Sequence, residues 1–334
     1  MEAIATMIPW AAGWRLGATL TLVAAMAATG AWAAGEEPHV TAAAAEPTED
    51  VPLYAAPTTT DGVGRIMAPV MVNGAGPFLF IVDTGATHSA LSPELVVRLG
   101  LDASTDAPLT VQGSTGALSV PSVLVDRLQA GDIVLKRRRL PVVASAVFAD
   151  ADGILGLEGL EKMRVSVDFG TDRIRISKHR DARPPGNWYR VPVQLRFGRL
   201  MIAKARVGEI QVDAVIDTGA ERTLGNLALR RALGLDQAAR ARVTESTVVG
   251  ATAIEYDANT IASPRILLGD TSLVSVDVTF ADLHIFRVWN LEERPAIVVG
   301  MDVLGTARAL LFDYRRKELM IRLEGGLLMR KENG

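Results

Sequence analysis

An internal repeat is the feature of this chain that most limits how it can fold. The segments FIVDTGATHSALSPELVVRLGLD and AVIDTGAERTLGNLALRRALGLD align without a gap, so that Asp83 corresponds to Asp217. The tetrapeptide LGLD that follows at residues 99–102 recurs in the same register at residues 233–236. Two motifs repeated at one separation predict two copies of a single folding unit.

The repeat continues downstream and sets the expected domain boundaries. QAGDIVL is echoed by LLGDTSL, GILGLEGL by IVVGMDVL, and VSVDFGTDRIRIS by LLFDYRRKELMIR. The sequence therefore predicts an N-terminal lobe at residues 64–180 and a C-terminal lobe at residues 189–324. Residues 181–188, in a stretch rich in charge, proline and glycine, are interpreted as the interlobe linker.

The apolar runs within each unit are short and rich in β-branched residues, and several alternate, as in SVDVTF and RIRIS. This pattern predicts β-strands. One short helix is expected in each lobe after the acid-bearing loop, capped by Ser92 in the first lobe and by Asn226 in the second. Gly100 and Gly234 follow the predicted helix ends. The expected fold class is mostly β, with two lobes related by a pseudo-two-fold axis.

Residues 1–34 are interpreted as a signal peptide or an N-terminal membrane anchor. Ala31 and Ala33 provide small residues at the positions that a signal peptidase reads, after an apolar run close to the lower length limit of a membrane span. Residues 35–63 hold few branched apolar residues and are expected to form a disordered linker. The sequence thus predicts an exported protein of the periplasm or cell envelope, either soluble after signal cleavage or anchored in the inner membrane.

The composition excludes several kinds of chemistry. The net charge of -3 argues against a nucleic-acid partner, and the absence of cysteine excludes thiol catalysis and cysteine-ligated metals. The four histidines show no metal-ligand spacing, so neither a metal nor a cofactor is expected. The basic run at residues 136–139 is interpreted as a solvated strand edge. Chemistry in this chain is therefore expected to depend on carboxylates or hydroxyls.

Each repeat carries Asp-Thr-Gly directly after an apolar, strand-like run. A single copy is well explained as a turn, because Asp and Gly are common turn residues. Two copies at equivalent places change this interpretation, since a pseudo-two-fold axis would bring Asp83 and Asp217 face to face. Close carboxylates share one proton, which provides an acid and a base at one site. A water held between them could attack an amide carbonyl without a metal or a covalent intermediate.

The residues that follow each aspartate fit the same arrangement. Gly85 and Gly219 permit close approach by a substrate or by the opposite loop, because they carry no side chain. Thr84 and Thr218 supply hydroxyls with two possible uses. They tie each loop to the opposite one, or they are satisfied within their own turns.

The chain resembles the aspartic proteases, both the two-lobed pepsin type and the dimeric retroviral type. The resemblance rests on VDTGA and IDTGA, each followed downstream by two apolar residues and a glycine, at residues 154–156 and 298–300. In the family, this apolar strand lies beside the catalytic loop. The resemblance implies two retropepsin-like β-barrel lobes, Asp83 and Asp217 as the catalytic pair, and an interlocked grip between the two threonines.

The family also closes a glycine-containing hairpin over its substrate. The candidates are the hairpin with Gly113 and Ser114 near its tip and the hairpin around Gly250, although each could be a plain surface hairpin. Glu221 falls where retroviral-type enzymes place an acid that contacts the substrate backbone, and a solvated pair with Arg222 explains it equally well. Alanine follows both Asp-Thr-Gly motifs where pepsin-type enzymes commonly have a hydroxyl, which predicts an optimum in mild acid.

The sequence therefore predicts an aspartic endopeptidase, with one chain as a monomeric catalytic unit and peptides or proteins as substrates. The alternative is an exported protein of the same fold that binds a peptide or an envelope partner without cutting it. A membrane-tethered structural protein would explain the N-terminus but would leave the paired motifs without a purpose.

Overall fold

The computed structural model describes most of the chain beyond residue 53. The expected signal peptide or anchor, the first part of the predicted linker and residues 179–187 lie outside the described residues. No helix in the described part of the chain is long and apolar enough to span a membrane. The described residues are 54–57, 59–60, 64–130, 133–158, 160, 163–178, 188–235 and 243–323.

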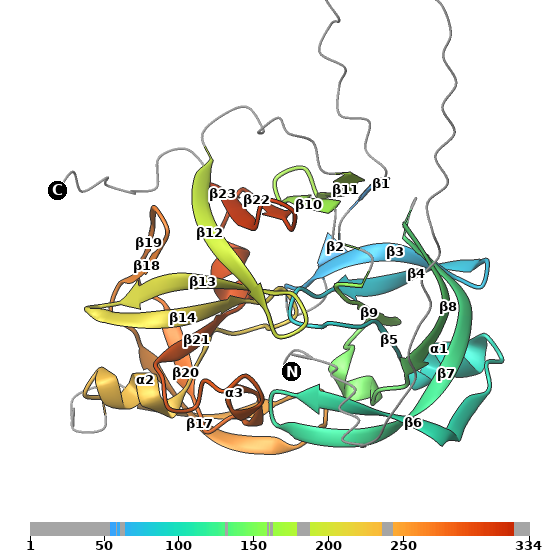
Figure 1. Cartoon of the computed structure of the whole chain (residues 1–334), viewed down its shortest axis with the longest axis horizontal. Coiled ribbons are helices and arrows are strands. Elements are labelled where there is room, and N and C mark those ends of the chain that lie inside the picture. The colour runs from blue at the N-terminus through green and yellow to red at the C-terminus, as the bar shows by residue number, and fades with distance from the viewer. Residues whose placement is uncertain are drawn as a thin grey trace, which may run out of the picture. The chain divides into compact units, whose positions relative to one another are not determined.

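The N-terminal lobe is built on one eight-stranded sheet, whose strands β3, β4, β7 and β8 stand out in Figure 1. The strand order is β5-β9-β4-β3-β7-β6, with β2 paired to β3 and β8 paired to β7. β4 pairs antiparallel with β3 and parallel with β9. The elements are β2 (Thr59–Thr60), β3 (Ile66–Val72), β4 (Ala75–Val82), β5 (Ala90–Leu91), α1 (Pro93–Arg98), β6 (Ala103–Gly113), β7 (Gly116–Ala130), β8 (Ile133–Pro141), the 3-10 helix η1 (Ser145–Val147) and β9 (Gly153–Leu155).

The C-terminal lobe repeats this plan with other loop lengths. β14 pairs antiparallel with β13 and parallel with β21, as β4 does with β3 and β9. The elements are β13 (Leu200–Val207), β14 (Ile210–Ile216), β15 (Leu224–Gly225), α2 (Leu227–Ala232), β16 (Val243–Val249), β17 (Glu255–Ala262), β18 (Ile266–Leu268), β19 (Thr271–Leu273), β20 (Asp277–Phe280), α3 (His284–Val288), β21 (Ala296–Val299) and α4 (Met301–Leu304).

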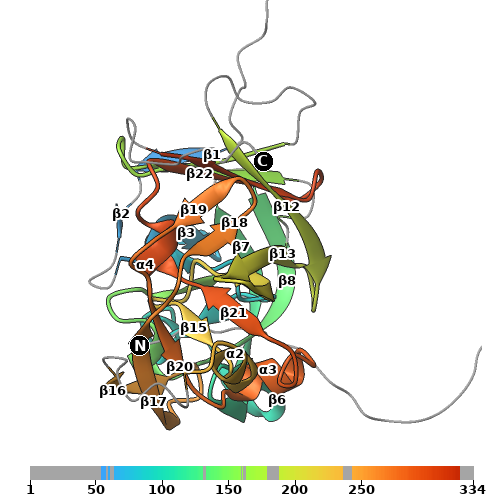
Figure 2. The same ribbon diagram turned by 90° about the vertical axis from the view of Figure 1, so that its left-hand side faces the viewer.

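A set of six strands joins the lobes in the order β1-β11-β10-β22-β23-β12. The central pair, β10 and β22, is antiparallel, and Arg164 Nε donates to Asp313 Oδ2 at 2.8 Å across it. The order is symmetric about this pair, because the N-terminal half of the chain provides β1, β11 and β10 and the C-terminal half provides β22, β23 and β12. β1 and β22 are labelled near the top of Figure 2. The strands are β1 (Tyr54–Pro57), β10 (Met163–Asp168), β11 (Arg173–Lys178), β12 (Tyr189–Arg196), β22 (Ala309–Asp313) and β23 (Glu318–Arg322).

One predicted boundary is wrong. The disordered linker was expected to reach residue 63, but strands β1 and β2 form within its last ten residues. β1 pairs with β11 from Tyr54↔Ile176 to Pro57↔Arg173, and so satisfies the backbone groups along that edge. No strand was predicted there, because the segment is held by backbone pairing and carries no alternating apolar pattern.

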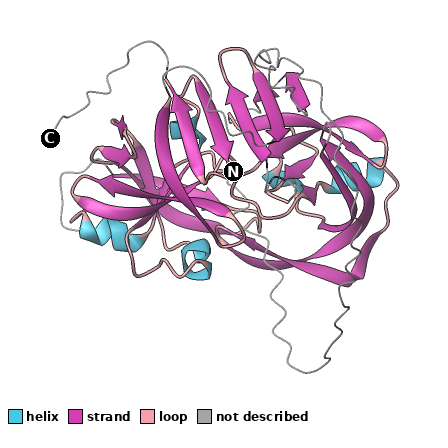
Figure 3. Ribbon diagram, turned by 45° about the horizontal axis from the view of Figure 1, so that its top comes forward, coloured by secondary structure: helices cyan, strands magenta, loops and turns pink. Residues whose placement is uncertain are grey.

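The predicted fold class is confirmed: strands greatly outnumber helices in Figure 3 and fall into two equivalent lobes. Both predicted helices are also confirmed. Ser92 Oγ accepts the N–H of Leu95 at 3.1 Å, and Asn226 Oδ1 accepts that of Leu229 at 2.8 Å, so each cap satisfies a first-turn donor. Residues 136–139 are exposed on β8, which pairs only with β7 among the described strands, as expected for a charged sheet edge.

Candidate active site

The two Asp-Thr-Gly loops occupy equivalent places at the ends of β4 and β14. Asp83 N donates to Leu155 O, and Asp217 N donates to Val299 O, both at 3.1 Å. The apolar-apolar-Gly segments at residues 154–156 and 298–300 therefore lie beside the loops, as the resemblance implied. Since β9 and β21 run parallel to the strands that carry the aspartates, each lobe holds its loop in the same way.

The two loops approach each other so closely that only glycine fits between them. A Cβ atom on Gly85 would lie 2.3 Å from Asp217 Oδ2, and one on Gly219 would lie 2.3 Å from Asp83 Cγ. Each carboxylate thus lies against the glycine of the opposite loop. This contact brings Asp83 and Asp217, which are far apart in the sequence, together at one site.

Backbone donors fix the orientation of both carboxylates. Asp83 Oδ1 accepts the N–H groups of Gly85 at 2.7 Å and Ala86 at 3.0 Å. Asp217 Oδ1 accepts those of Gly219 at 2.9 Å and Ala220 at 3.2 Å. Asp83 Oδ2 is buried, and the Asp83 carboxyl can hydrogen-bond to the Asp217 side chain when the pair carries a proton.

The threonines link the loops beneath the carboxylates. Thr84 N donates to Thr218 Oγ1 and Thr218 N donates to Thr84 Oγ1, both at 3.0 Å. The hydroxyls in turn donate to the opposite strands, Thr84 to Ile216 O at 3.0 Å and Thr218 to Val82 O at 2.7 Å. The alternative in which each threonine is satisfied within its own turn is therefore excluded.

Burial dominates the electrostatics of the two carboxyls, which are each 1% exposed. Burial raises the pKa of Asp83 well above its ordinary value, and the charge of Asp217 raises it further. Burial also raises the pKa of Asp217 to about 6, although N–H groups of Gly219 and Ala220 act in the opposite direction. The pKa of Asp217 lies at about 6 and its charge raises the pKa of Asp83, so Asp217 ionises first and the pair holds one proton at about pH 6 and above.

Two buried residues that interact with the aspartate pair were not predicted from the sequence. Arg65 is 1% exposed, its Nη1 donates to Val147 O at 3.0 Å, and its charge lowers the pKa of both aspartates. The repeat could have drawn attention to Arg65, since GRIM at residues 64–67 recurs as GRLM at residues 198–201. Tyr314 is also buried; burial raises its pKa, and the charge of Asp83 raises it further.

The two candidate hairpins meet at their tips. We call β6–β7 flap 1 and β16–β17 flap 2. Thr115 Oγ1 lies 3.0 Å from Thr252 Oγ1 and accepts the N–H of Gly250 at 3.3 Å. A Cβ on Gly250 would lie 2.2 Å from Ser114 Oγ, and one on Gly113 would lie 3.2 Å from Ala251. The structure thus brings Gly113, Ser114 and Gly250 together, in contacts that plain surface hairpins would not make.

Glu221 is held differently from the other predicted residues. Its carboxylate lies 3.8 Å from Arg222 Nε, and its carbonyl accepts the N–H of Asp302 at 3.0 Å. The equivalent residue of the first lobe is Thr87, which packs against the turn at Gly198. The two halves of the site therefore differ beyond the loops, and the substrate role predicted for Glu221 stays a prediction. Among the described residues, no cluster of acids and histidines could hold a metal.

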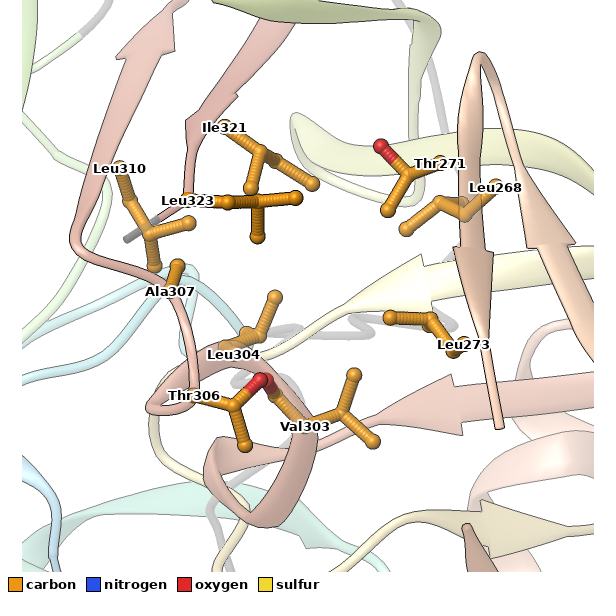
Figure 4. Close-up of a pocket in the computed structure, with 10 residues that line it drawn as sticks. All are labelled: Leu268, Thr271, Leu273, Val303, Leu304, Thr306, Ala307, Leu310, Ile321 and Leu323. Atoms are coloured by element: carbon orange, nitrogen blue, oxygen red, sulfur yellow. The ribbon is translucent and has the colours of Figure 1, made fainter. Parts of the chain in front are cut away.

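A separate cavity lies in the C-terminal lobe between β18–β19, α4 and β22–β23 (Figure 4). It encloses about 290 Å³ including its open mouth, and its lining is apolar apart from two threonines. Thr271 Oγ1 is buried there without a hydrogen-bond partner among the described residues. Because no acid lines this cavity, it is not part of the aspartate site. Its lining is Leu268, Thr271, Leu273, Val303, Leu304, Thr306, Ala307, Leu310, Ile321 and Leu323.

The fold and the paired loops define an acid-protease class of structure, and a sequence comparison agrees with it. The family model for aspartyl protease matches residues 68–159 and 203–303, one segment in each lobe and together more than half of the chain. The chain belongs to the aspartyl protease family. Comparison with curated proteins found no match.

Proposed function

We propose that this protein is an aspartic endopeptidase that hydrolyses peptide bonds with a water activated between Asp83 and Asp217. The observation that supports this most is the pair of buried carboxyls from two lobes, each lying against the glycine of the opposite loop. The raised pKa of each carboxyl supports a pair that still holds one proton at about pH 6 and above. Such a pair supplies a general base and a general acid at once.

The proposed reaction uses both protonation states of the pair. The ionised carboxylate takes a proton from the water as the water oxygen attacks the amide carbon. At the same time the protonated carboxyl donates its proton to the carbonyl oxygen. The carboxyl that took the proton from water passes it to the amide nitrogen, a hydroxyl of the diol gives its proton to the other carboxylate, and the C–N bond breaks to release an acid and an amine. The Thr84–Thr218 grip keeps the two carboxyls in register, so that neither has to be reoriented during the reaction.

A peptide in extended form is the substrate that the surroundings favour. Ala86 belongs to one buried apolar cluster with Val111 of flap 1 and Ala251 of flap 2, so apolar side chains lie beside the Asp83 loop. We propose neither a metal nor a cofactor, and neither a nucleic acid nor a second chain as a partner for catalysis. The same proposal includes export to the periplasm or cell envelope, with a possible membrane tether, which N-terminal sequencing of exported protein would test.

The proposed activity is tested with the purified exported chain and a mixed peptide library between pH 3 and pH 7. Asp83→Asn and Asp217→Asn are each expected to lower cleavage by about 1,000-fold or more, because each removes the acid–base pair. Asp270→Asn, which changes an exposed carboxyl in a turn, is the matched control. Cleavage that survives both active-site substitutions would reject the mechanism.

The alternative function is a binding module of the same fold that does not cut its partner. It predicts peptide binding without cleavage at every pH by the unaltered chain. The two adjacent buried carboxyls favour catalysis, because a purely binding site gains nothing from two buried acids whose pKa values are both raised.

A further inference from the structure

Helix α3 of the C-terminal lobe is bonded to flap 1 of the N-terminal lobe. His284 Nε2 lies 2.8 Å from Gln112 Oε1, and Ile285 N donates to Ser114 O at 3.2 Å. Both flap residues lie at or beside the tip, where the strands turn. One hydrogen bond uses side chains and the other uses the backbone, so α3 holds the tip at two points.

The helix has a firm base on which to hold the flap. Ile285, Phe286 and Trp289 are each no more than 1% exposed. The Trp289 ring packs edge-on against Phe286 at 6.2 Å between centroids and stacks on Phe197 at 6.1 Å. Moving α3 would expose these rings, which makes the helix the fixed partner in its contact with the flap.

Flap 2 lacks the groups that make this contact. Aligning VQGST with VVGAT places Val249 opposite Gln112 and Ala251 opposite Ser114, so flap 2 has no side-chain amide at that position. Its polar tip contacts are those of Gly250 and Thr252 with Thr115 of flap 1. The side-chain half of the α3 contact therefore has no pseudo-symmetric partner in the sequence of flap 2.

One of the two flaps has to move before a substrate can reach the aspartates. Both carboxyls are 1% exposed, and the flap tips bury Ser114, Thr115 and Thr252 against each other. We propose that α3 is a latch that keeps flap 1 in place, so that flap 2 is the flap that opens. His284 and Gln112 are then positioning residues for flap 1, and the significance of the latch for substrate entry rests on the proposed peptidase function.

Hydrogen exchange of the full chain without substrate tests the latch. In the unaltered protein, amides at the tip of flap 1 and at Ile285 are expected to exchange more slowly than amides at the tip of flap 2. Removing one hydrogen bond by Gln112→Leu or His284→Ala is expected to speed exchange at the flap 1 tip about fivefold, with flap 2 changed by less than about twofold. Gln112→Glu keeps an acceptor for His284 and is expected to restore slow exchange.

Arg287→Ala is the matched control, because it removes an exposed ion pair with Asp282 from the same helix without touching the flap. Unchanged exchange in both latch variants, or equal acceleration of both flaps, would overturn the proposal. Since no substrate is present, a chain that proves unable to cut peptides refutes the peptidase function and leaves this measurement intact. If the chain does cut peptides, the latch variants are expected to change KM by more than kcat, because the aspartates are untouched.

Discussion

The loops that carry Asp83 and Asp217 make the same contacts in both lobes, whereas the hairpins above them do not. The threonine grip consists of two hydrogen bonds of 3.0 Å in opposite directions, and a Cβ on either glycine would lie 2.3 Å from the opposite carboxyl. Among the described residues, the side-chain hydrogen bond from a helix of the other lobe is found at flap 1, between His284 and Gln112. Position relative to the pseudo-two-fold axis accounts for this difference.

A residue on the axis contacts its own equivalent, so a change on one side must be matched by a change on the other. Thr84 with Thr218 and Thr115 with Thr252 are such pairs. A residue away from the axis meets a different neighbour in each lobe and can diverge. Arg65 is buried while its equivalent Arg199 is exposed, and the charge of Arg65 acts on both aspartates.

The largest expected effect tests the equivalence of the loops. Gly85→Ala and Gly219→Ala each place a methyl group within 2.5 Å of the opposite carboxyl. Each is expected to lower peptide cleavage by at least about 100-fold, because the reacting groups are displaced. Gly74→Ala, in a turn with open space but a φ of +84°, is the control: it strains the backbone away from the site and is expected to lower stability without lowering the cleavage rate of the folded protein. If the cleavage rates of the two loop variants differed by tenfold, the two loops would not be equivalent.

The second test compares the axial threonine pairs. Thr84→Val and Thr218→Val are each expected to lower the free energy of unfolding by about 2 to 4 kcal/mol, since each leaves a buried N–H and a buried carbonyl without partners. The double variant should cost less than the sum, because both residues share one network. Thr115→Val at the flap tips is expected to lower the free energy of unfolding by only about 1 kcal/mol. If chemical denaturation gave the same loss for Thr115→Val as for Thr84→Val, the difference expected between the two threonine pairs would be contradicted.

The third prediction concerns stability against pH. The pKa of Asp217 is about 6 in the folded chain and 3.8 ordinarily, so the folded state binds more protons between these values. This stabilisation is fully present below about pH 4 and is lost as pH rises through about 6, with a total of about 2 to 3 kcal/mol. Asp217→Asn is expected to make the melting temperature depend less on pH between pH 4 and pH 7. A profile as steep as that of the unaltered chain would refute the assignment.

The fourth prediction uses the divergence between Thr271 and its repeat equivalent Ile133. Thr271 buries a hydroxyl without a partner among the described residues, so Thr271→Val is expected to raise the free energy of unfolding by about 1 kcal/mol. The reciprocal change Ile133→Thr, in a buried site of the N-terminal lobe, should lower it by a similar or larger amount. Both are measured by denaturant unfolding. A loss of stability in Thr271→Val would show that the hydroxyl is satisfied.

The smallest expected effect concerns the two arginines. Arg65 lowers the pKa of both aspartates, so Arg65→Met should move the pH–rate profile for peptide cleavage upward by about half a unit. Arg199→Met, at the exposed equivalent position, should leave the profile in place. Equal shifts in the two variants would show that the asymmetry has no electrostatic consequence at the site. A profile that peaks near pH 2 in the unaltered chain would refute the mild-acid optimum itself.

Some features were readable from the sequence because they depend on local pattern. The short β-branched runs predicted the strands, and Ser92 and Asn226 predicted the helix starts that the caps confirm. The gapless repeat placed Asp83 and Asp217 at equivalent positions, which made a paired site the natural expectation. The strand at Tyr54–Pro57 was missed, since it is defined by pairing with β11 and by no pattern of its own.

The sequence by itself determined the duplication, the strand-rich lobes and the identity of the residues that could meet at the axis. Only the tertiary structure decided which contacts those residues make: the exchange of hydrogen bonds between Thr84 and Thr218, the burial of Arg65 beside the aspartates, and the bond from His284 to Gln112. The physical reason is that a repeat specifies equivalent positions in two lobes, whereas burial and hydrogen bonding between lobes depend on how the lobes pack. Asymmetry above the site therefore became visible only in the folded chain.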